Sequence, residues 1–298
     1  MGIGVPREVL RQVRRIELQT RGWVETLFGG EYQSVFKGQG MEFAEVREYE
    51  PGDDVRDIDW NVTARTGRPH VKKHVEEREL TVLLAVDLSG SKQFGTRERF
   101  KAELAAEIAA VLALSAVRNN DRVGLLIFTD RVEHFVPPRK GRRHVLRLIR
   151  DVLAFRPAGR GTDLRGAMEF AARVLPHKAI VFLLSDFDTP LEGVERTLKI
   201  VSRRHDLVAV SIVDAAEEVL PNAGVLVLAD PETGEEVMVD TGSRALRDAY
   251  LGLHGRQRDE RRKLFRRLAI DEIEVRTGES YINPLLAFFR RRERMLKR

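Results

Sequence analysis

The chain has 298 residues, of which 43% are hydrophobic and 33% charged, a composition typical of soluble globular proteins. It contains no cysteine, which excludes a disulfide framework and a thiolate metal site. No apolar run approaches the ~20 residues that a membrane-spanning helix needs. The first residues contain no apolar segment of the kind found in signal peptides, so a signal peptide is not expected. We therefore expect a cytoplasmic protein without a membrane span.

The first 79 residues form an N-terminal segment with its own pattern. Residues 1–20 predict a weakly amphipathic helix, and residues 28–79 are rich in glycine and charge, which favours strands and turns. We expect Trp60 to lie in a core. We expect the acidic residues near it to cap turns or to pair with arginines; they are Asp53, Asp54, Asp57 and Asp59.

Residues 80–214 alternate between apolar runs and amphipathic segments, which predicts an α/β fold with a doubly wound, mostly parallel sheet. The predicted strands cover 80–86, 121–128, 178–185 and 207–213, with 132–136 as an antiparallel edge partner. The predicted helices cover 97–117, 144–152, 164–174 and 194–201. The flanking segments, 1–79 and 215–298, are expected to be accessory parts containing strands and helices.

Residues 215–298 predict a β-hairpin formed by 225–228 and 236–239, followed by a helix from about 243 to 269. We expect an interruption of that helix near Gly252 or Gly255, and a final helix with Asn283 as its cap and Pro284 at its first position. Basic runs at 256–263 and 290–298 carry most of the net charge of +5. They are expected to be solvated helix faces that steer partners rather than specify them.

Polar side chains follow two of the predicted strands and one intervening loop. Asp87, Ser89 and Ser91 follow the first buried strand, Thr162 lies in the loop 159–164, and Asp186 follows the strand 178–185. The carboxyl ends of parallel strands meet at one edge of a sheet, where ligands of such folds bind. Carboxylates and hydroxyls are hard oxygen ligands, so we expect Mg²⁺ or Mn²⁺ there rather than zinc.

The sequence Asp87-Leu88-Ser89-Gly90-Ser91 resembles the metal-ion-dependent adhesion site of von Willebrand factor A domains. That resemblance implies that Ser89 and Ser91 bind the metal directly, that Asp87 and Asp186 bind it directly or through water, and that Thr162 completes the set. An Asp or Glu of a protein partner would fill the open position. Lys92 stands where many such domains have an apolar methionine, so a cation lies next to the motif.

Residues 38–43, 47–60 and 64–67, just upstream of this motif, are similar in order to the bacterial family called domain of unknown function 58. This resemblance implies a protein-binding adaptor or cochaperone that is not an enzyme. It also implies a MoxR-type AAA+ ATPase as the partner.

Two other functions are weighed against the adaptor. A Mg²⁺-dependent phosphohydrolase could use Asp87 as its nucleophile, but Ser89 occupies the place of the expected second acid and no general base follows. A binder of nucleic acid or of a membrane surface could use the basic C-terminus, but no aromatic recognition module accompanies it, so nucleic acid is not expected. A zinc site at His70 and His74 lacks a third ligand.

Overall fold

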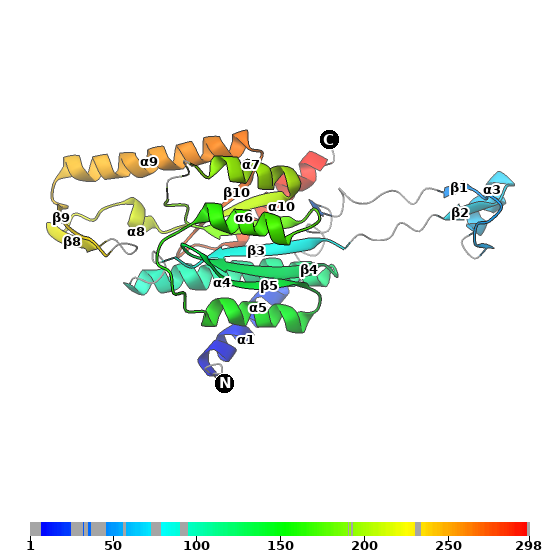
Figure 1. Ribbon diagram of the computed structural model, residues 1–298, viewed down its shortest axis with the longest axis horizontal. Coiled ribbons are helices and arrows are strands. Elements are labelled where there is room, and N and C mark those ends of the chain that lie inside the picture. The colour runs from blue at the N-terminus through cyan, green and yellow to red at the C-terminus, as the bar shows by residue number, and fades with distance from the viewer. Residues whose placement is uncertain are drawn as a thin grey trace.

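A six-stranded sheet forms the centre of the molecule (Figure 1). The computed structural model describes residues 7–24, 32, 35–36, 46–55, 58–72, 79–89, 95–189, 191, 193–229 and 234–296. The strand order is β10-β7-β6-β3-β4-β5, and β5 is antiparallel to β4 while the other neighbours are parallel. The strands are β3 (Thr81–Asp87), β4 (Arg122–Phe128), β5 (Val132–Arg139), β6 (Ile180–Ser185), β7 (Asp206–Val213) and β10 (Asp271–Arg276).

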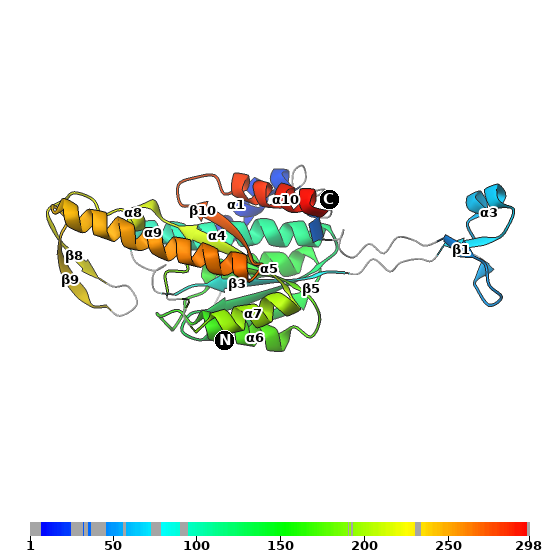
Figure 2. The ribbon, with the colours of Figure 1, turned by 90° about the horizontal axis from the view of Figure 1, so that it is seen from above.

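Helices cover both faces of this sheet, as the strand–helix alternation predicts (Figures 1 and 2). One face packs against α1 (Arg7–Trp23), α4 (Gly95–Arg118), α5 (Arg142–Ala154) and α10 (Ile282–Leu296). The other packs against α6 (Leu164–Val174), α7 (Glu195–Arg204) and the end of α9 (Arg244–Arg267). The predicted mixed α/β fold with a mostly parallel sheet is therefore confirmed.

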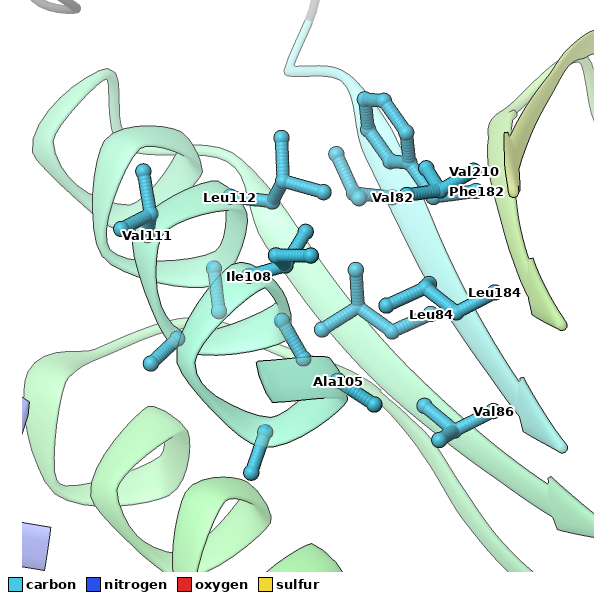
Figure 3. Close-up of a cluster of buried hydrophobic side chains, with 14 of the residues drawn as sticks. Val82, Leu84, Val86, Ala105, Ile108, Val111, Leu112, Phe182, Leu184 and Val210 are labelled. Carbon is cyan, nitrogen blue, oxygen red and sulfur yellow. The ribbon is translucent and has the colours of Figure 1, made fainter. Parts of the chain in front are cut away.

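Alternating residues of β3 face the two layers, which explains why its run is continuously apolar. Val82, Leu84 and Val86 lie against α4, as Figure 3 shows. Leu83 and Ala85 belong to the core on the opposite face, and all five side chains are at most 1% exposed. Burial on both faces fixes the register of β3. It therefore also fixes the position of the residues that follow the end of the strand.

The sheet includes a strand that the sequence analysis did not predict. β10 lies beyond residue 214 and pairs in parallel with β7, so the sheet is completed by the C-terminal segment.

Two expectations for the C-terminal helices are also corrected. The expected interruption of the long helix is wrong, because α9 runs without a break from Arg244 to Arg267 and Ser243 caps it. The last helix begins at Ile282, so Asn283 and Pro284 lie inside its first turn. A proline is tolerated there because its missing N–H would have no helical partner.

Residues 46–72 form an arm that lies apart from the sheet, beyond the amino ends of its strands (Figures 1 and 2). It consists of β1 (Val46–Glu48), α3 (Trp60–Thr66) and β2 (His70–Lys72), and β1 and β2 are antiparallel. Asp59 caps α3 by accepting from the backbone N–H groups of Asn61 and Val62, as the sequence predicted. Trp60, in contrast, is 67% exposed, so its predicted core position is wrong. The arm has too little apolar sequence to enclose an indole.

The predicted hairpin is present as β8 (Val225–Ala229) and β9 (Glu236–Asp240). Together with the short helix α8 (Ala215–Glu218) and the first half of α9, it extends past the carboxyl ends of the parallel strands (Figures 1 and 2). The hairpin and the arm thus lie at opposite ends of the molecule. No helix in the described part of the chain is long and apolar enough to cross a membrane.

Candidate metal-binding edge

The carboxylate of Asp87 is fully buried at the end of β3 and is held from two sides. Its Oδ1 accepts from the backbone N–H of Ser89 at 2.9 Å, and its Oδ2 accepts from the hydroxyl of Ser185 at 2.6 Å. Ser185 ends β6, the strand next to β3, and its hydroxyl oxygen also accepts from the N–H of Phe187 at 3.1 Å. A buried carboxylate is costly unless hydrogen-bonded, so these contacts fix the orientation of Asp87.

Ser185 was not among the predicted site residues. The available signal was its position, since it directly precedes Asp186 at the end of the apolar run 178–185. A serine at the carboxyl end of a strand beside β3 is within reach of the residue that ends β3.

The loop that carries Thr162 is attached to the end of β4, the other neighbour of β3. Glu133 Oε1 accepts from the backbone N–H of Gly159 at 2.7 Å and from the hydroxyl of Thr129 at 2.9 Å. The N–H of Asp163 donates to the carbonyl of Thr129 at 2.8 Å. A Cβ atom at position 159 would lie 2.3 Å from the Thr129 hydroxyl oxygen, so the close approach of the loop requires glycine there.

Asp186 lies on the third segment of this edge and contacts a buried cation. The ammonium of Lys101, on α4, lies 3.3 Å from Asp186 Oδ2 and 2.5 Å from Glu217 Oε2 on α8. Lys101 is 1% exposed, and the side chain of Asp186 is 8% exposed. The ion pair therefore lies inside the protein, where water screens it little.

The charges at this edge influence one another. Burial lowers the pKa of the Lys101 ammonium, but the carboxylates of Asp186 and Glu217 outweigh burial and raise that pKa above its ordinary value. Burial raises the pKa of Glu217, and burial together with the charge of Asp186 raises that of Asp188. The charges of Lys101 and Arg261 oppose the rise in the pKa of Asp188, so carboxylates and cations are interleaved at this edge.

The fold places the described members of the predicted set on three neighbouring strands in the order β6-β3-β4. Asp87 and Ser89 follow β3, Asp186 follows β6, and Thr162 lies on the loop attached to β4. Ser91, the fifth predicted ligand, and Lys92 lie outside the described residues. Within the part of the chain that is described, no three His, Cys, Asp or Glu side chains are grouped so as to hold a metal ion. The predicted donors are two carboxylates and hydroxyls, a set suited to Mg²⁺ or Mn²⁺.

A cavity of about 360 Å³ lies between α9 and the segment that follows β6, and its lining begins at Phe187. Phe187, Leu191 and Leu264 supply its apolar lining. Its charged lining is mixed, with Arg261 and Arg267 beside three acidic residues, Asp188, Glu195 and Glu260.

The two basic runs are not the uniformly solvated faces that the sequence predicted. In the first, Arg261 Nε donates to Glu272 at 2.9 Å and is 8% exposed. In the second, Arg292 is held by Asp206 and Asp271. Part of the basic charge therefore binds β7 and β10 to the helices that cover them.

The expectation that acidic residues of this segment pair with arginines is confirmed for Asp53, whose Oδ1 lies 2.6 Å from Arg47 Nη2 on the arm. Of the two histidines considered for zinc, the Nδ1 atom of His70 lies 3.1 Å from the hydroxyl of Thr66. His74 lies outside the described residues.

Two mycobacterial relatives match nearly the whole length of this chain. Proteins of Mycobacterium tuberculosis (strain ATCC 25618 / H37Rv) and of Mycobacterium bovis, both named as uncharacterized, are 32% identical over 286 residues, which is 95% of this chain and 89% of each relative. Among solved structures, the conserved hypothetical protein BatB from Bacteroides thetaiotaomicron aligns over 74% of this chain and 100% of its own, with 14% identity and a TM-score of 0.45. An aerotolerance-related membrane protein from Bacteroides fragilis covers 72% of this chain and 99% of its own, with 16% identity and a TM-score of 0.47.

The family comparison agrees with the motifs that precede Asp87. A family profile described as "Protein of unknown function DUF58" matches residues 45–260, which include the arm, the first five strands of the sheet and most of α9. The chain belongs to the DUF58 family.

Proposed function

We propose that this chain is a Mg²⁺-dependent protein-binding adaptor whose metal-binding edge is formed by Asp87, Ser89, Ser91, Thr162 and Asp186. The observation that carries the proposal is the fixed carboxylate of Asp87, which Ser89 and Ser185 orient at the end of the central strand. A buried carboxylate with both oxygens hydrogen-bonded is preorganised to bear negative charge, and a hard cation is its natural ligand.

The proposed mode of binding is the one implied by von Willebrand factor A domains, which this chain resembles in its motif. Mg²⁺ requires nearly octahedral coordination and often keeps open positions for ligands from elsewhere. An Asp or Glu of a partner protein would take one such position, so that binding requires both the metal and an acidic side chain. The cavity lined by Phe187, Leu191 and Leu264 would receive a neighbouring apolar side chain of the same partner.

We further propose a MoxR-type AAA+ ATPase as the partner and a cochaperone role for the complex. This identity rests on the family resemblance. The hairpin β8–β9 supports the general idea of protein binding, because Val225, Val227 and Met238 are each at least 59% exposed close to the same end of the molecule. Exposed apolar side chains gathered on a hairpin mark contact surfaces in many proteins.

The test is capture of the partner in the presence of Mg²⁺ or EDTA. Tagged wild-type protein should retain the ATPase in Mg²⁺ and release it in EDTA. Asp87→Asn should lose this capture while Asp259→Asn, an equal change on the exposed part of α9, should keep it. Asparagine is preferred to alanine, because Asp87 is fully buried and alanine would leave the Ser185 hydroxyl without its acceptor.

Equal capture by the wild type, by Asp87→Asn and in EDTA would reject the metal-dependent mechanism. The phosphohydrolase alternative is addressed with the same proteins. Hydrolysis of a phosphate monoester that needs Mg²⁺ and is lost in Asp87→Asn would favour the enzyme instead of the adaptor.

A further inference from the structure

Lys101 places a positive charge inside the protein at the same edge that is proposed to bind the metal. Its ammonium lies 3.3 Å from Asp186 Oδ2, and the residue is only 1% exposed. A lysine is almost never fully buried unless it is paired, because the charge loses its hydration. The carboxylates that contact the Lys101 ammonium therefore make its burial possible, and the apolar side chains of α4 do not.

The second carboxylate that Lys101 meets belongs to the C-terminal segment. Glu217 Oε2 lies 2.5 Å from the ammonium, and Glu217 is part of α8, which directly follows β7. The ammonium thus bridges Asp186 at the metal-binding edge and a helix at the base of the hairpin β8–β9. Because the side chain of Glu217 is 45% exposed whereas that of Asp186 is 8% exposed, Glu217 is the partner that has room to move.

The helix α8 is also attached to the elements behind it. Glu218 pairs with Arg276 of β10 at 3.2 Å and with Arg258 of α9. The hydroxyl of Tyr250 on α9 donates to the backbone carbonyl of Glu217 at 2.9 Å. A change in the contact between Lys101 and Glu217 would therefore reach α9 and the hairpin through direct contacts.

We infer that Lys101 is an internal cation that competes with the divalent metal for Asp186 and couples metal binding to the position of α8. The inference rests on the proposed function, since it concerns the same edge. Any cation bound by Asp186 lies within a few ångströms of the ammonium, and like charges at that separation repel strongly in a poorly hydrated site. Metal binding must therefore move the ammonium away from Asp186, and Glu217, which already lies 2.5 Å from it, is the carboxylate that moves with it.

Two consequences follow for the protein. The affinity for Mg²⁺ is lower than the oxygen donors alone would give, because displacement of the ammonium opposes metal binding. In addition, the metal-free and metal-bound proteins differ in the contacts of α8, so the surface formed by α8, α9 and the hairpin reports whether metal is present. Such a coupling is reciprocal, so a partner that shifts α8 also changes the affinity for the metal.

The experiment measures Mg²⁺ binding to the full chain by titration calorimetry, with MgCl₂ alone as the probe. Lys101→Met keeps the length of the side chain and removes the charge, and it should tighten the Kd by about tenfold or more. Lys199→Met removes an equal charge from the exposed side of α7 and should leave the Kd unchanged. In Glu217→Gln the Lys101 ammonium has Asp186 as its remaining carboxylate partner among these two, so it competes more strongly with the metal. The Kd for Mg²⁺ should therefore rise severalfold.

Hydrogen exchange supplies a second measurement that does not depend on affinity. Addition of Mg²⁺ to the wild type should change the exchange of the backbone amides of residues 215–218, and the change should be absent in Lys101→Met. If Lys101→Met does not fold, Glu217→Gln and the wild-type exchange still decide the question. Glu217→Gln with an unchanged Kd, together with unchanged exchange in α8, would overturn the inference.

The outcomes separate this inference from the proposed function. If the wild type and Lys101→Met bind Mg²⁺ equally and Asp87→Asn does not bind it, the metal site stands and the competition is rejected. If none of the three proteins binds Mg²⁺, the proposed function is rejected and the inference with it. Mg²⁺ binding that is measurable only in Lys101→Met would support both the metal site and the competition by Lys101.

Discussion

The guanidinium of Arg292 donates from Nη1 and Nη2 to the two carboxylate oxygens of Asp206, at 2.6 and 2.7 Å. Its Nε donates to Asp271 at 2.6 Å, and it lies over the rings of Phe36 and Phe288, 5.5 and 4.9 Å from their centroids. Asp206 begins β7 and Asp271 begins β10, so one residue of α10 joins the amino ends of two neighbouring strands. Arg292 is thus part of the fold although it lies in a run of basic residues.

Replacement of Arg292 by Gln should lower the free energy of unfolding by about 1–3 kcal/mol, because Asp206 would lose its charge partner and Asp271 would keep Arg291 as its partner. Urea denaturation measures the change. Arg294→Gln removes an equal charge from an exposed position of α10 and should alter stability by less than about 0.5 kcal/mol. Similar losses in the two variants would contradict a structural role for Arg292.

Replacement of Trp60 by Ala should change the free energy of unfolding of the sheet by less than about 0.5 kcal/mol, because the indole is 67% exposed. Phe289→Ala, in contrast, should cost about 3–5 kcal/mol, since that ring is fully buried against Phe36. Thermal and urea unfolding followed by circular dichroism compares the two. A large loss in Trp60→Ala would mean that the arm packs against the body in solution.

Replacement of Ser185 by Ala should weaken Mg²⁺ binding and also lower stability by about 1–2 kcal/mol, because Asp87 would lose the hydroxyl that donates to it at 2.6 Å. Titration with MgCl₂ and urea denaturation measure the two effects. Ser202→Ala, near the end of α7 that leads into the amino end of β7, is the matched control and should show neither effect. A variant with reduced stability but unchanged metal affinity would show that Ser185 supports the fold alone.

Stability should fall as the pH falls below about 6.5, in part because of His205. This residue is 3% exposed, neither ring nitrogen has a hydrogen-bond partner among the described residues, and burial and then the charge of Arg204 lower its pKa. Below the ordinary pKa of 6.5 the unfolded chain binds a proton that the folded protein does not, so the free energy of unfolding decreases until the lower pKa of the folded state is reached.

Urea denaturation between pH 5 and 7 tests this expectation. His205→Phe should show a shallower loss of stability over that range than the wild type. His177→Phe, an equal change at an exposed position, should follow the wild type. Identical slopes for all three proteins would show that His205 is not the group responsible.

The central strands could be predicted from the sequence, because a strand that is buried on both faces has apolar residues at nearly every position. β10 was missed for the opposite reason. Its sequence alternates acidic and apolar residues, and only Ile273 and Val275 are buried. Glu272 and Glu274 are stabilised by Arg261 and Arg262 of α9, which no local pattern within residues 271–276 can indicate.

The interruption expected in α9 did not occur, although Gly252 and Gly255 both lie in the helix. Each glycine costs roughly 1 kcal/mol relative to alanine. That cost does not break a helix of 24 residues whose first turn is capped by Ser243 and whose last turns are buried at Leu264 and Phe265.

The order of oxygen-bearing residues along the chain was enough to propose Asp87, Thr162 and Asp186 as neighbours, because strand order brings their segments together. It could not indicate Lys101 and Glu217. A single lysine in an amphipathic helix is typical of a solvated position, and its burial becomes apparent only when carboxylates from two distant segments are placed around it.

The pairing of β10 with β7 also affects how the protein folds during synthesis. A nascent chain emerges from the ribosome with β7 before the hairpin, α9 and β10 have been made, so the outer edge of β7 has no neighbour during that interval. Six of its eight residues are buried in the finished protein, and such an edge can pair with other chains. The late arrival of β10 therefore creates a period in which a chaperone that shields β7 would raise the yield of folded protein.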